Sequence, residues 1–275
     1  MLLPLLLGAI TGLALGLTGG GGTMLALPLM MLGLGVAAHE ATAMALVAVG
    51  IMALVGALTR MRAHQLQWHL GLLFAAAGMA GAPLGTWIAG FLPATVVTWG
   101  FAVIAVVVAV RMWRRGHGPL PTDSAPLPPG ALLRQASCRF DPTGRLRLTS
   151  QCLRLLIPAG LVTGVISGIF GVGGGFVVVP ALVLIAGIDI RQATATSLLV
   201  VALVSLSGAG SAVLAGHHVD LRLTLWFAGG GILGLEAGSR LGRFSDPQIA
   251  QSGFAIVVIL VAATLIFVSF DKGPS

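Results

Sequence analysis

Two glycine clusters decide how this chain folds: Thr18-Gly19-Gly20-Gly21-Gly22-Thr23 and Phe170-Gly171-Val172-Gly173-Gly174-Gly175. Near-consecutive glycines end a helix, because glycine permits positive φ angles and leaves backbone N–H groups uncovered. A helix that starts just after such a break presents free N–H groups and the positive end of its dipole, which together bind anions. The alternative is that the glycines only allow close helix packing.

The composition around the clusters excludes a soluble globule. Of the 275 residues, 57% are hydrophobic and only 8% are charged, against about 25% charged in a soluble domain. The net charge of +7 is concentrated, since residues 111–154 hold eight arginines and two aspartates. A basic stretch between apolar halves indicates a cytoplasmic topology anchor. A nucleic-acid partner is not expected.

The glycine spacing recurs 152 residues along the chain. Gly12-x3-Gly16-x2-Gly19-x-Gly21-Gly22-x5-Pro28 becomes Gly164-x3-Gly168-x2-Gly171-x-Gly173-Gly174-x5-Pro180. After one inserted residue, Gly78, Gly81 and Gly85 match Gly231, Gly234 and Gly238. A register kept over roughly 100 residues predicts a duplicated architecture. The expected domains are membrane repeat 1 at 1–113, a cytoplasmic linker at 114–153 and membrane repeat 2 at 154–275.

The predicted fold is an all-α polytopic membrane protein, in which each half is a glycine-broken helical hairpin plus three transmembrane helices. The hairpin pieces are 2–17 with 23–36, and 155–170 with 175–187. Each reaches only about 20–24 Å, less than the roughly 30 Å hydrocarbon core, so none is expected to span alone. The longer segments are 40–60, 67–90, 93–113, 192–214, 222–242 and 247–269. In the linker, Asp141-Pro142-Thr143-Gly144 suits a small β-hairpin, with a disordered tether as the alternative.

Two topologies compete. If each glycine-broken pair enters and leaves on one side, the halves are inverted, and basic residues divide 13 against 2 in favour of the linker side. If each pair is one broken span, the halves are parallel and the division is 12 against 3. Both place the linker in the cytoplasm, where Cys138 and Cys152 are expected to be reduced thiols. Inversion is preferred, because broken elements in inverted repeats recur in secondary transporters.

One family resemblance rests on these motifs. The Gly-rich turn followed by Pro in both halves, and the run Ala193-Thr194-Ala195-Thr196-Ser197-Leu-Leu, resemble the sulfite exporter TauE/SafE family of permeases. The resemblance covers both membrane halves and implies a multi-pass carrier of sulfite, sulfonates or related organosulfur anions. Half one has Met44-Ala45 where half two has Thr196-Ser197, so polar ligation is expected to be lopsided.

The candidate site follows from the two breaks, which are expected to face each other near the midplane. The expected substrate-binding residues are Thr18, Gly19, Gly21, Gly22, Thr23, Gly171, Gly173, Gly174, Gly175, Thr196 and Ser197. Candidates for coupling or gating are Glu236, Arg191 and Arg240. Glu236 could carry a proton within its apolar segment, or pair with Arg240 four residues on. No catalytic residue, cofactor or metal site is expected, because the sequence lacks Walker, GxSxG and HExxH motifs.

The sequence thus predicts a secondary transporter of a small anion in the plasma membrane, which is the inner membrane of a bacterium. Its partners would be the anion and the lipid bilayer, and a homo-oligomer is left open. Alternating access would follow from rocking one half against the other. The alternatives are a passive anion channel, and a membrane scaffold or accessory subunit without transport of its own.

Overall fold

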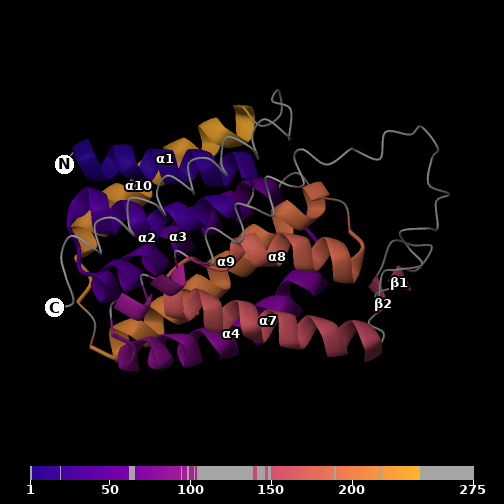
Figure 1. Cartoon of the computed structure of the whole chain (residues 1–275). Coiled ribbons are helices and arrows are strands. Elements are labelled where there is room, and N and C mark those ends of the chain that lie inside the picture. The colour runs from indigo at the N-terminus through magenta and orange to yellow at the C-terminus, as the bar shows by residue number, and fades with distance from the viewer. Residues whose placement is uncertain are drawn as a thin grey trace.

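The structure is a computed structural model that describes residues 2–18, 20–61, 66–93, 95–97, 99–101, 103, 139–140, 146–147, 150–188, 190–216 and 218–241. The described chain is a bundle of helices with one small β-hairpin at its edge (Figure 1). The long helices are α1 (Leu2–Thr18), α3 (Ala38–Met61), α4 (Trp68–Phe91), α7 (Ser150–Phe170), α9 (Ile190–Leu214) and α10 (Leu221–Leu241). The predicted all-helical membrane fold is therefore confirmed in its class.

Among the described residues, four helices are long and apolar enough to cross a membrane: His39–Met61, Trp68–Phe91, Cys152–Phe170 and Arg191–Leu214. The third corrects an expectation, since the sequence predicts a piece at 155–170 that is too short to span. Helix α7 starts at Ser150 and has 21 residues, which reach about 31 Å. Helix α10 has the predicted bounds within one residue but is not among these four. The segment 247–269, and most of 93–113, lie outside the described residues.

Short elements follow each glycine cluster. In half one they are the 3-10 helix η1 (Gly21–Leu25), α2 (Ala26–Pro28) and the π-helix η2 (Leu29–Gly33); in half two they are α8 (Gly175–Ala181) and the π-helix η3 (Leu182–Ala186). A π-helix thus follows shortly after the matched prolines, Pro28 and Pro180. Proline lacks an N–H donor and disturbs regular α-helical hydrogen bonding. Gly35 and Gly187, also 152 residues apart, have matching positive φ angles of 68° and 67°.

The chain after the first break folds back along α1. A Cβ atom built on Gly22 would touch Leu15, whereas one built on Gly33 would touch the side chain of Leu7. Contacts that move back along α1 as the chain advances describe an antiparallel hairpin. In half two, Gly174 lies beside Ser167 and Thr163 of α7, which are the positions a matching hairpin would bring together.

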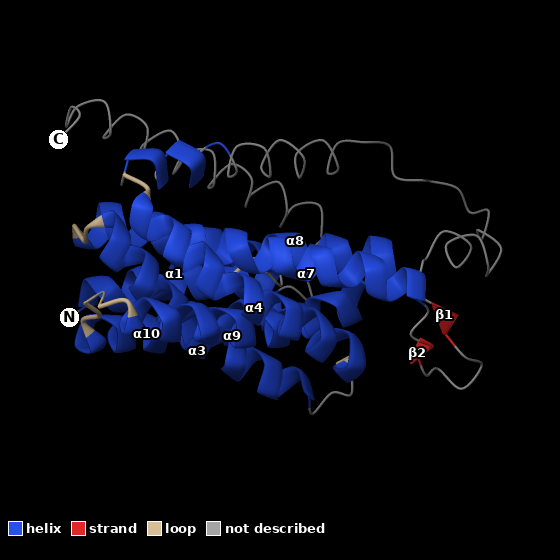
Figure 2. Cartoon of the chain, turned by 90° about the horizontal axis from the view of Figure 1, so that it is seen from below, coloured by secondary structure: helices blue, strands red, loops and turns tan. Residues whose placement is uncertain are grey.

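The long helices pair across the two halves of the sequence. Helix α1 packs against α10, α7 packs against α4, and α3 packs against α9 (Figures 1 and 2). The first pair is parallel, because Gly8 and Gly16 of α1 lie beside Phe227 and Leu235 of α10.

The other pairs are oriented by their own close contacts. Helices α4 and α7 are parallel, since Gly81 lies beside Leu161 and Gly85 beside Val165. Helices α3 and α9 are antiparallel, since Leu46 lies beside Gly208, whereas Gly56 lies beside Leu198. The first helix of each half therefore packs against the last described long helix of the other half, α1 on α10 and α7 on α4.

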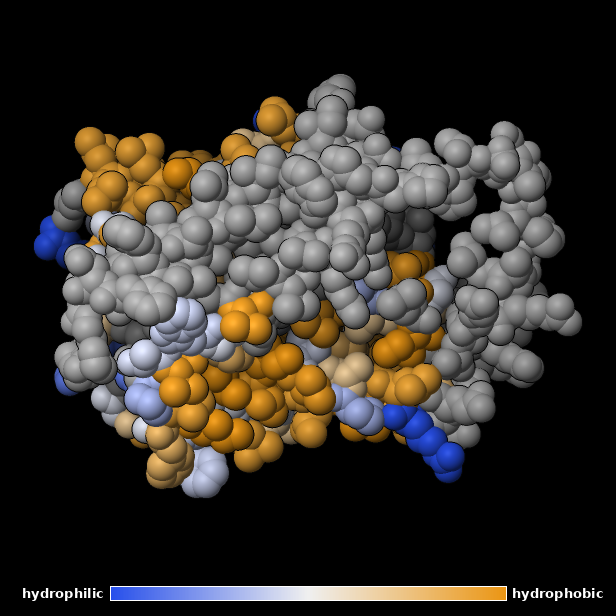
Figure 3. All heavy atoms as spheres, viewed as in Figure 1, coloured by the Kyte–Doolittle hydropathy of each residue, from blue (hydrophilic) through white to orange (hydrophobic). Residues whose placement is uncertain are grey.

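The described surface is broadly apolar along the bundle, and hydrophilic side chains gather toward its ends (Figure 3). Large apolar side chains such as Trp87, Phe91, Leu214 and Leu233 are exposed. Such exposure is costly in water but normal for helices that face lipid.

The linker contributes a β-hairpin. Strand β1 (Arg139–Phe140) pairs antiparallel with β2 (Leu146–Arg147), in the register Arg139 with Arg147. The hairpin alternative is therefore confirmed. Cys152 is disulfide-bonded, which contradicts the expectation of reduced thiols and is the state typical of oxidising compartments. Cys138 lies outside the described residues.

Candidate functional site

The two glycine breaks meet inside the bundle. A Cβ atom built on Gly20 would lie 2.6 Å from the carbonyl oxygen of Gly175, and one built on Gly175 would lie 2.8 Å from the carbonyl oxygen of Gly20. Both residues are buried. Only glycine allows the two backbones to approach this closely. Segments 155 residues apart in sequence thus share one interior point.

The half-one break is compact. Gly21, Gly22 and Thr23 are the first residues of η1, and Thr23 Oγ1 donates a hydrogen bond of 2.9 Å to the carbonyl oxygen of Gly20. The Thr23 hydroxyl therefore already stabilises the turn. Thr18 is the last residue of α1, its side chain is not described, and Gly19 lies outside the described residues.

The half-two break is a left-handed turn. Gly171, Gly173 and Gly174 have φ angles of 67°, 68° and 66°, a conformation that side-chain-bearing residues rarely adopt. The N–H of Gly171 donates to the carbonyl oxygen of Ser167 at 2.8 Å, and the carbonyl oxygen of Gly174 accepts from Val177 at 2.9 Å. No hydrogen bond between described residues uses the N–H groups of Gly173 or Gly174. Two backbone donors are thus left at a buried turn.

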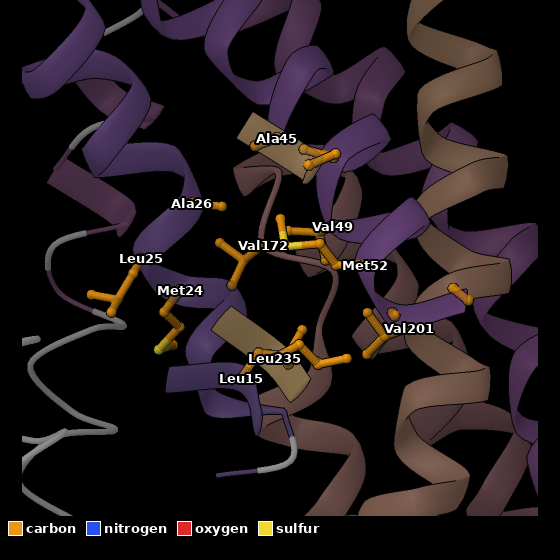
Figure 4. Packing of buried hydrophobic residues seen from close by; sticks show 14 of the residues in the cluster. Leu15, Met24, Leu25, Ala26, Ala45, Val49, Met52, Val172, Val201 and Leu235 are labelled. Atoms are coloured by element: carbon orange, nitrogen blue, oxygen red, sulfur yellow. The ribbon is translucent and has the colours of Figure 1, made fainter. Parts of the chain in front are cut away.

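Helices α3 and α9 form the walls around this turn. A Cβ atom on Gly171 would lie 2.9 Å from the Cα of Thr42, and one on Gly173 would lie 2.9 Å from both Val49 Cγ1 and Ser205 Oγ. The side chain of Val172 packs into an apolar cluster with Met52 and its neighbours (Figure 4). The surroundings are therefore mostly apolar, with hydroxyl groups as the polar side chains.

Thr196 and Ser197, the side-chain ligands expected in half two, are buried in α9 but already have structural partners. Thr196 Oγ1 accepts a hydrogen bond of 3.1 Å from the N–H of Gln67, just before α4. Ser197 Oγ donates at 2.8 Å to the carbonyl oxygen of Thr194. The closest contacts of the glycine turn on α9 are instead Val201 and Ser205, one to two turns further along.

Two hydroxyls that sequence reasoning missed lie beside the turn. Ser167 and Ser205 are fully buried, and neither Oγ atom has a hydrogen-bond partner in the part of the chain that the structure describes. The signal was present in the repeat, because the matched positions in half one are the apolar Leu15 and Ala53. A comparison of the halves for polar replacements would have found both serines.

The charged candidates lie away from the breaks. Arg240 Nε and Glu236 Oε1 form an ion pair of 3.1 Å, with side chains 72% and 48% exposed. This geometry favours the structural pair over a buried proton carrier. Arg191 is exposed near the start of α9. The buried polar side chains of the described chain all belong to Ser and Thr, and its His, Cys, Asp and Glu residues form no group able to hold a metal.

Comparisons with known proteins agree with one another. The family model "Sulfite exporter TauE/SafE" matches residues 4–265. A "Probable membrane transporter protein" of Xylella fastidiosa strain 9a5c is 31% identical over 96% of this chain and 94% of its own length. The "Probable membrane transporter protein YdhB" of Bacillus subtilis is 22% identical over 94% of this chain and 97% of its own length. No solved structure matches the chain.

Proposed function

Because the chain belongs to the sulfite exporter TauE/SafE family, and is therefore a membrane transporter, we propose that it is a secondary transporter of a small anion, sulfite or an organosulfonate. The observation that carries the proposal is the contact between Gly20 and Gly175. It brings the two unwound segments to one buried point, which is where broken-helix transporters bind their substrates. The plasma membrane is the proposed location.

We further propose that the halves are inverted repeats. Parallel contacts link α1 to α10 and α4 to α7, whereas α3 and α9 are antiparallel. Helix α10 runs with α3, since Met52 lies beside Gly231 and Gly56 beside Leu235. Helix α4 likewise runs with α9, from the Gln67–Thr196 bond to the Thr86–Ser211 bond of 2.7 Å. Corresponding helices of the two halves therefore point in opposite directions, which supports inversion.

The charge distribution supports a cytoplasmic linker. The helix directions place the ends of α3 and α10 and the starts of α4, α7 and α9 at the same end of the bundle as the hairpin (Figure 1). The charged residues described there are Arg60, Arg139, Arg147, Arg154, Arg191, Arg240 and Glu236. The opposite end has Arg222, Glu40 and Asp220. An excess of arginine marks the cytoplasmic side, so we propose that the hairpin end of the bundle faces the cytoplasm. The disulfide at Cys152, a state typical of oxidising compartments, argues for the opposite orientation.

The helix pairing also changes how alternating access would work. Because α1 packs on α10 and α7 on α4, the halves are interleaved and cannot rock as separate sequence units. The moving bodies would be α1 with α3 and α10, against α4 with α7 and α9. The glycine contacts of α1 with α10 are backbone to backbone, whereas Gly50 faces side chains of α9 at ordinary contact distances of 3.4 Å. We propose that motion occurs at the α3–α9 interface.

The proposed site would hold its anion without a buried cation. Backbone N–H groups and hydroxyls donate to an oxyanion, and buried basic groups are absent from the described interior. Hydrogen bonds to an ion are individually stronger than neutral ones, yet the site lacks an ion pair that would have to be broken for release. This chemistry suits a carrier that must bind and release its substrate in each cycle.

Flux through proteoliposomes tests the proposal. Purified protein should move sulfite or a small sulfonate, with counter-flow when the same anion is preloaded on the far side. A passive channel would show flux that follows the membrane potential without counter-flow. An accessory subunit would show no flux, would tolerate Gly173→Leu and would lose its function when residues 116–150 are deleted. A carrier requires the opposite pattern for those two changes.

A further inference from the structure

Ser167 on α7 and Ser205 on α9 are exceptional among the helical hydroxyls. Thr11, Thr163 and Thr224 donate to the carbonyl four residues earlier, at 3.0, 2.6 and 2.7 Å. A hydroxyl in a helix usually finds such a backbone acceptor. Ser167 and Ser205 are both 0% exposed, and their Oγ atoms have no hydrogen-bond partner among the described residues. A buried polar group without a partner destabilises the fold, so its presence needs an explanation.

The two serines flank the same turn from different helices. A Cβ atom built on Gly173 would lie 2.9 Å from Ser205 Oγ, and one built on Gly174 would lie 3.6 Å from the Cβ of Ser167. The N–H groups of these two glycines make no hydrogen bond with another described residue. Two hydroxyls and two amides without a partner among the described residues are therefore gathered around one left-handed turn.

The arrangement exists in one half only. The equivalents of Ser167 and Ser205 are Leu15 and Ala53, and both are buried in the apolar cluster that the two halves share. Gly20 in the half-one break has an extended φ of 176°, unlike the left-handed glycines of half two. Unpartnered buried serines are therefore described beside one of the two breaks, although the sequence has two similar glycine clusters.

We propose that Ser167 and Ser205, together with the N–H groups of Gly173 and Gly174, bind the oxyanion group of the transported substrate. This inference rests on the proposed function and narrows it to one subsite. It reassigns the side-chain ligands, since the hydroxyls of Thr196 and Ser197 already bond to the protein itself. These groups suit a sulfite or sulfonate oxygen, because both serine hydroxyls and both backbone N–H groups can donate a hydrogen bond to it.

The test compares serine variants of the full-length purified protein. Binding of sodium sulfite, sodium sulfate and sodium methanesulfonate is measured by calorimetry against sodium chloride, and thermal stability is measured on the same samples. The variants are Ser167→Ala and Ser205→Ala. The matched control is Ser207→Ala, which removes a hydroxyl on α9 that donates to the carbonyl of Met79 at 3.0 Å.

The proposal expects each site variant to bind the preferred anion about tenfold more weakly or worse, the loss typical of a hydrogen bond to a charged group. Their melting temperatures should equal or exceed that of the wild type, because an unpaired buried hydroxyl is removed. Ser207→Ala should bind like the wild type. Ser205→Cys keeps the shape with a weaker donor, so it should weaken binding even if Ser205→Ala folds poorly.

Two results would overturn the assignment in distinguishable ways. If the wild type binds and transports an anion while both alanine variants bind it equally well, the serines are not ligands and the transporter proposal stands. A lower melting temperature with unchanged affinity would show the same, with a bound water as the partner of each hydroxyl. If the wild type neither binds nor transports any of the three anions, the proposed function fails and the subsite falls with it.

Discussion

Replacing Gly12 with alanine should separate α1 from α10. The new Cβ atom would lie 2.8 Å from the Cα of Gly231 and closer still to its carbonyl oxygen, whereas ordinary contact begins at 3.4 Å. The two backbones would therefore have to move apart by about 0.6 Å or more. Neither side can yield locally, because both contacting groups are main chain.

The cost of this separation can be estimated. A gap of that size forfeits about a quarter to a half of each dispersion contact, and overpacking of this kind costs about 1–3 kcal/mol. Lost Cα–H···O contacts add about 0.5–1 kcal/mol each. The higher helix propensity of alanine offsets about 1 kcal/mol. We expect a net loss of about 2 kcal/mol, with a similar loss for Gly164→Ala, which meets Gly78 in the equivalent pair.

Reversible unfolding in mixed detergent micelles, followed by tryptophan fluorescence, would measure the loss. Gly231→Ala should cost less, because its Cβ atom meets the flexible side chain of Met52 rather than backbone. Gly229→Ala on the same helix meets nothing within 4 Å and should be neutral or slightly stabilising. If Gly12→Ala proves as stable as Gly229→Ala, then α1 and α10 do not pack as described.

Four further outcomes follow from the site and the topology. Gly173→Ala should abolish anion flux while the protein stays folded, because the φ of 68° and the nearby Ser205 leave no room for a Cβ atom at the turn. The control Gly210→Ala, whose Cβ atom meets nothing within 4 Å, should retain wild-type flux, and retained flux in both variants would contradict a role of the turn in transport. Glu236→Gln should leave the pH dependence of flux unchanged and change the free energy of unfolding by less than about 0.5 kcal/mol, since the ion pair of Glu236 with Arg240 is exposed. Loss of proton coupling in this variant would instead identify Glu236 as the proton carrier. In a protein without native cysteines, oxidation of the pair Gly50→Cys and Ser205→Cys should stop residual flux reversibly, because their Cβ atoms would be 3.4 Å apart across the moving interface. The control pair, Ala82→Cys and Gly208→Cys, would have its Cβ atoms 3.6 Å apart within one body, and its oxidation should leave flux unchanged. Block of flux by both pairs would refute the assignment of the moving bodies. In the same background, Ser124→Cys in the linker should react with a membrane-impermeant maleimide in inside-out vesicles, and labelling in intact cells would reverse the topology.

The element pattern of this protein was largely predictable from its sequence. The apolar segments end where glycine, proline or charged residues interrupt them, and these signals are local, so the predicted bounds of α3, α4, α9 and α10 differ from the observed ones by two residues at most. The start of α7 was missed by five residues, because its first turn, Ser150 to Leu153, contains polar residues that resemble the linker. Polar residues at a helix start do not prevent helix formation when the following turns are apolar.

The pairing of helices was less accessible. A repeat shows that two halves are alike but not whether each half packs on itself or on its partner. The exchange of α1 and α7 depends on glycine faces that match across the halves, Gly12 with Gly231 and Gly164 with Gly78. Both faces were visible in the sequence, yet a glycine face on one helix is compatible with any close-packed neighbour.

The predictions about the site residues show the same difference between local signals and contacts with distant parts of the chain. Local reasoning identified the glycine breaks, because backbone freedom is a property of the residue itself. It could not rank the hydroxyls, because whether a hydroxyl is available depends on what lies opposite it. The N–H of Gln67 bonds to Thr196 Oγ1, whereas no described group bonds to Ser205 Oγ. The duplication supplied two breaks, but a carrier that moves one anion per cycle needs only one polar site. In the proposed subsite, the apolar residues Leu15 and Ala53 leave half one to support the backbone contact at Gly20, while half two supplies the hydrogen-bond donors.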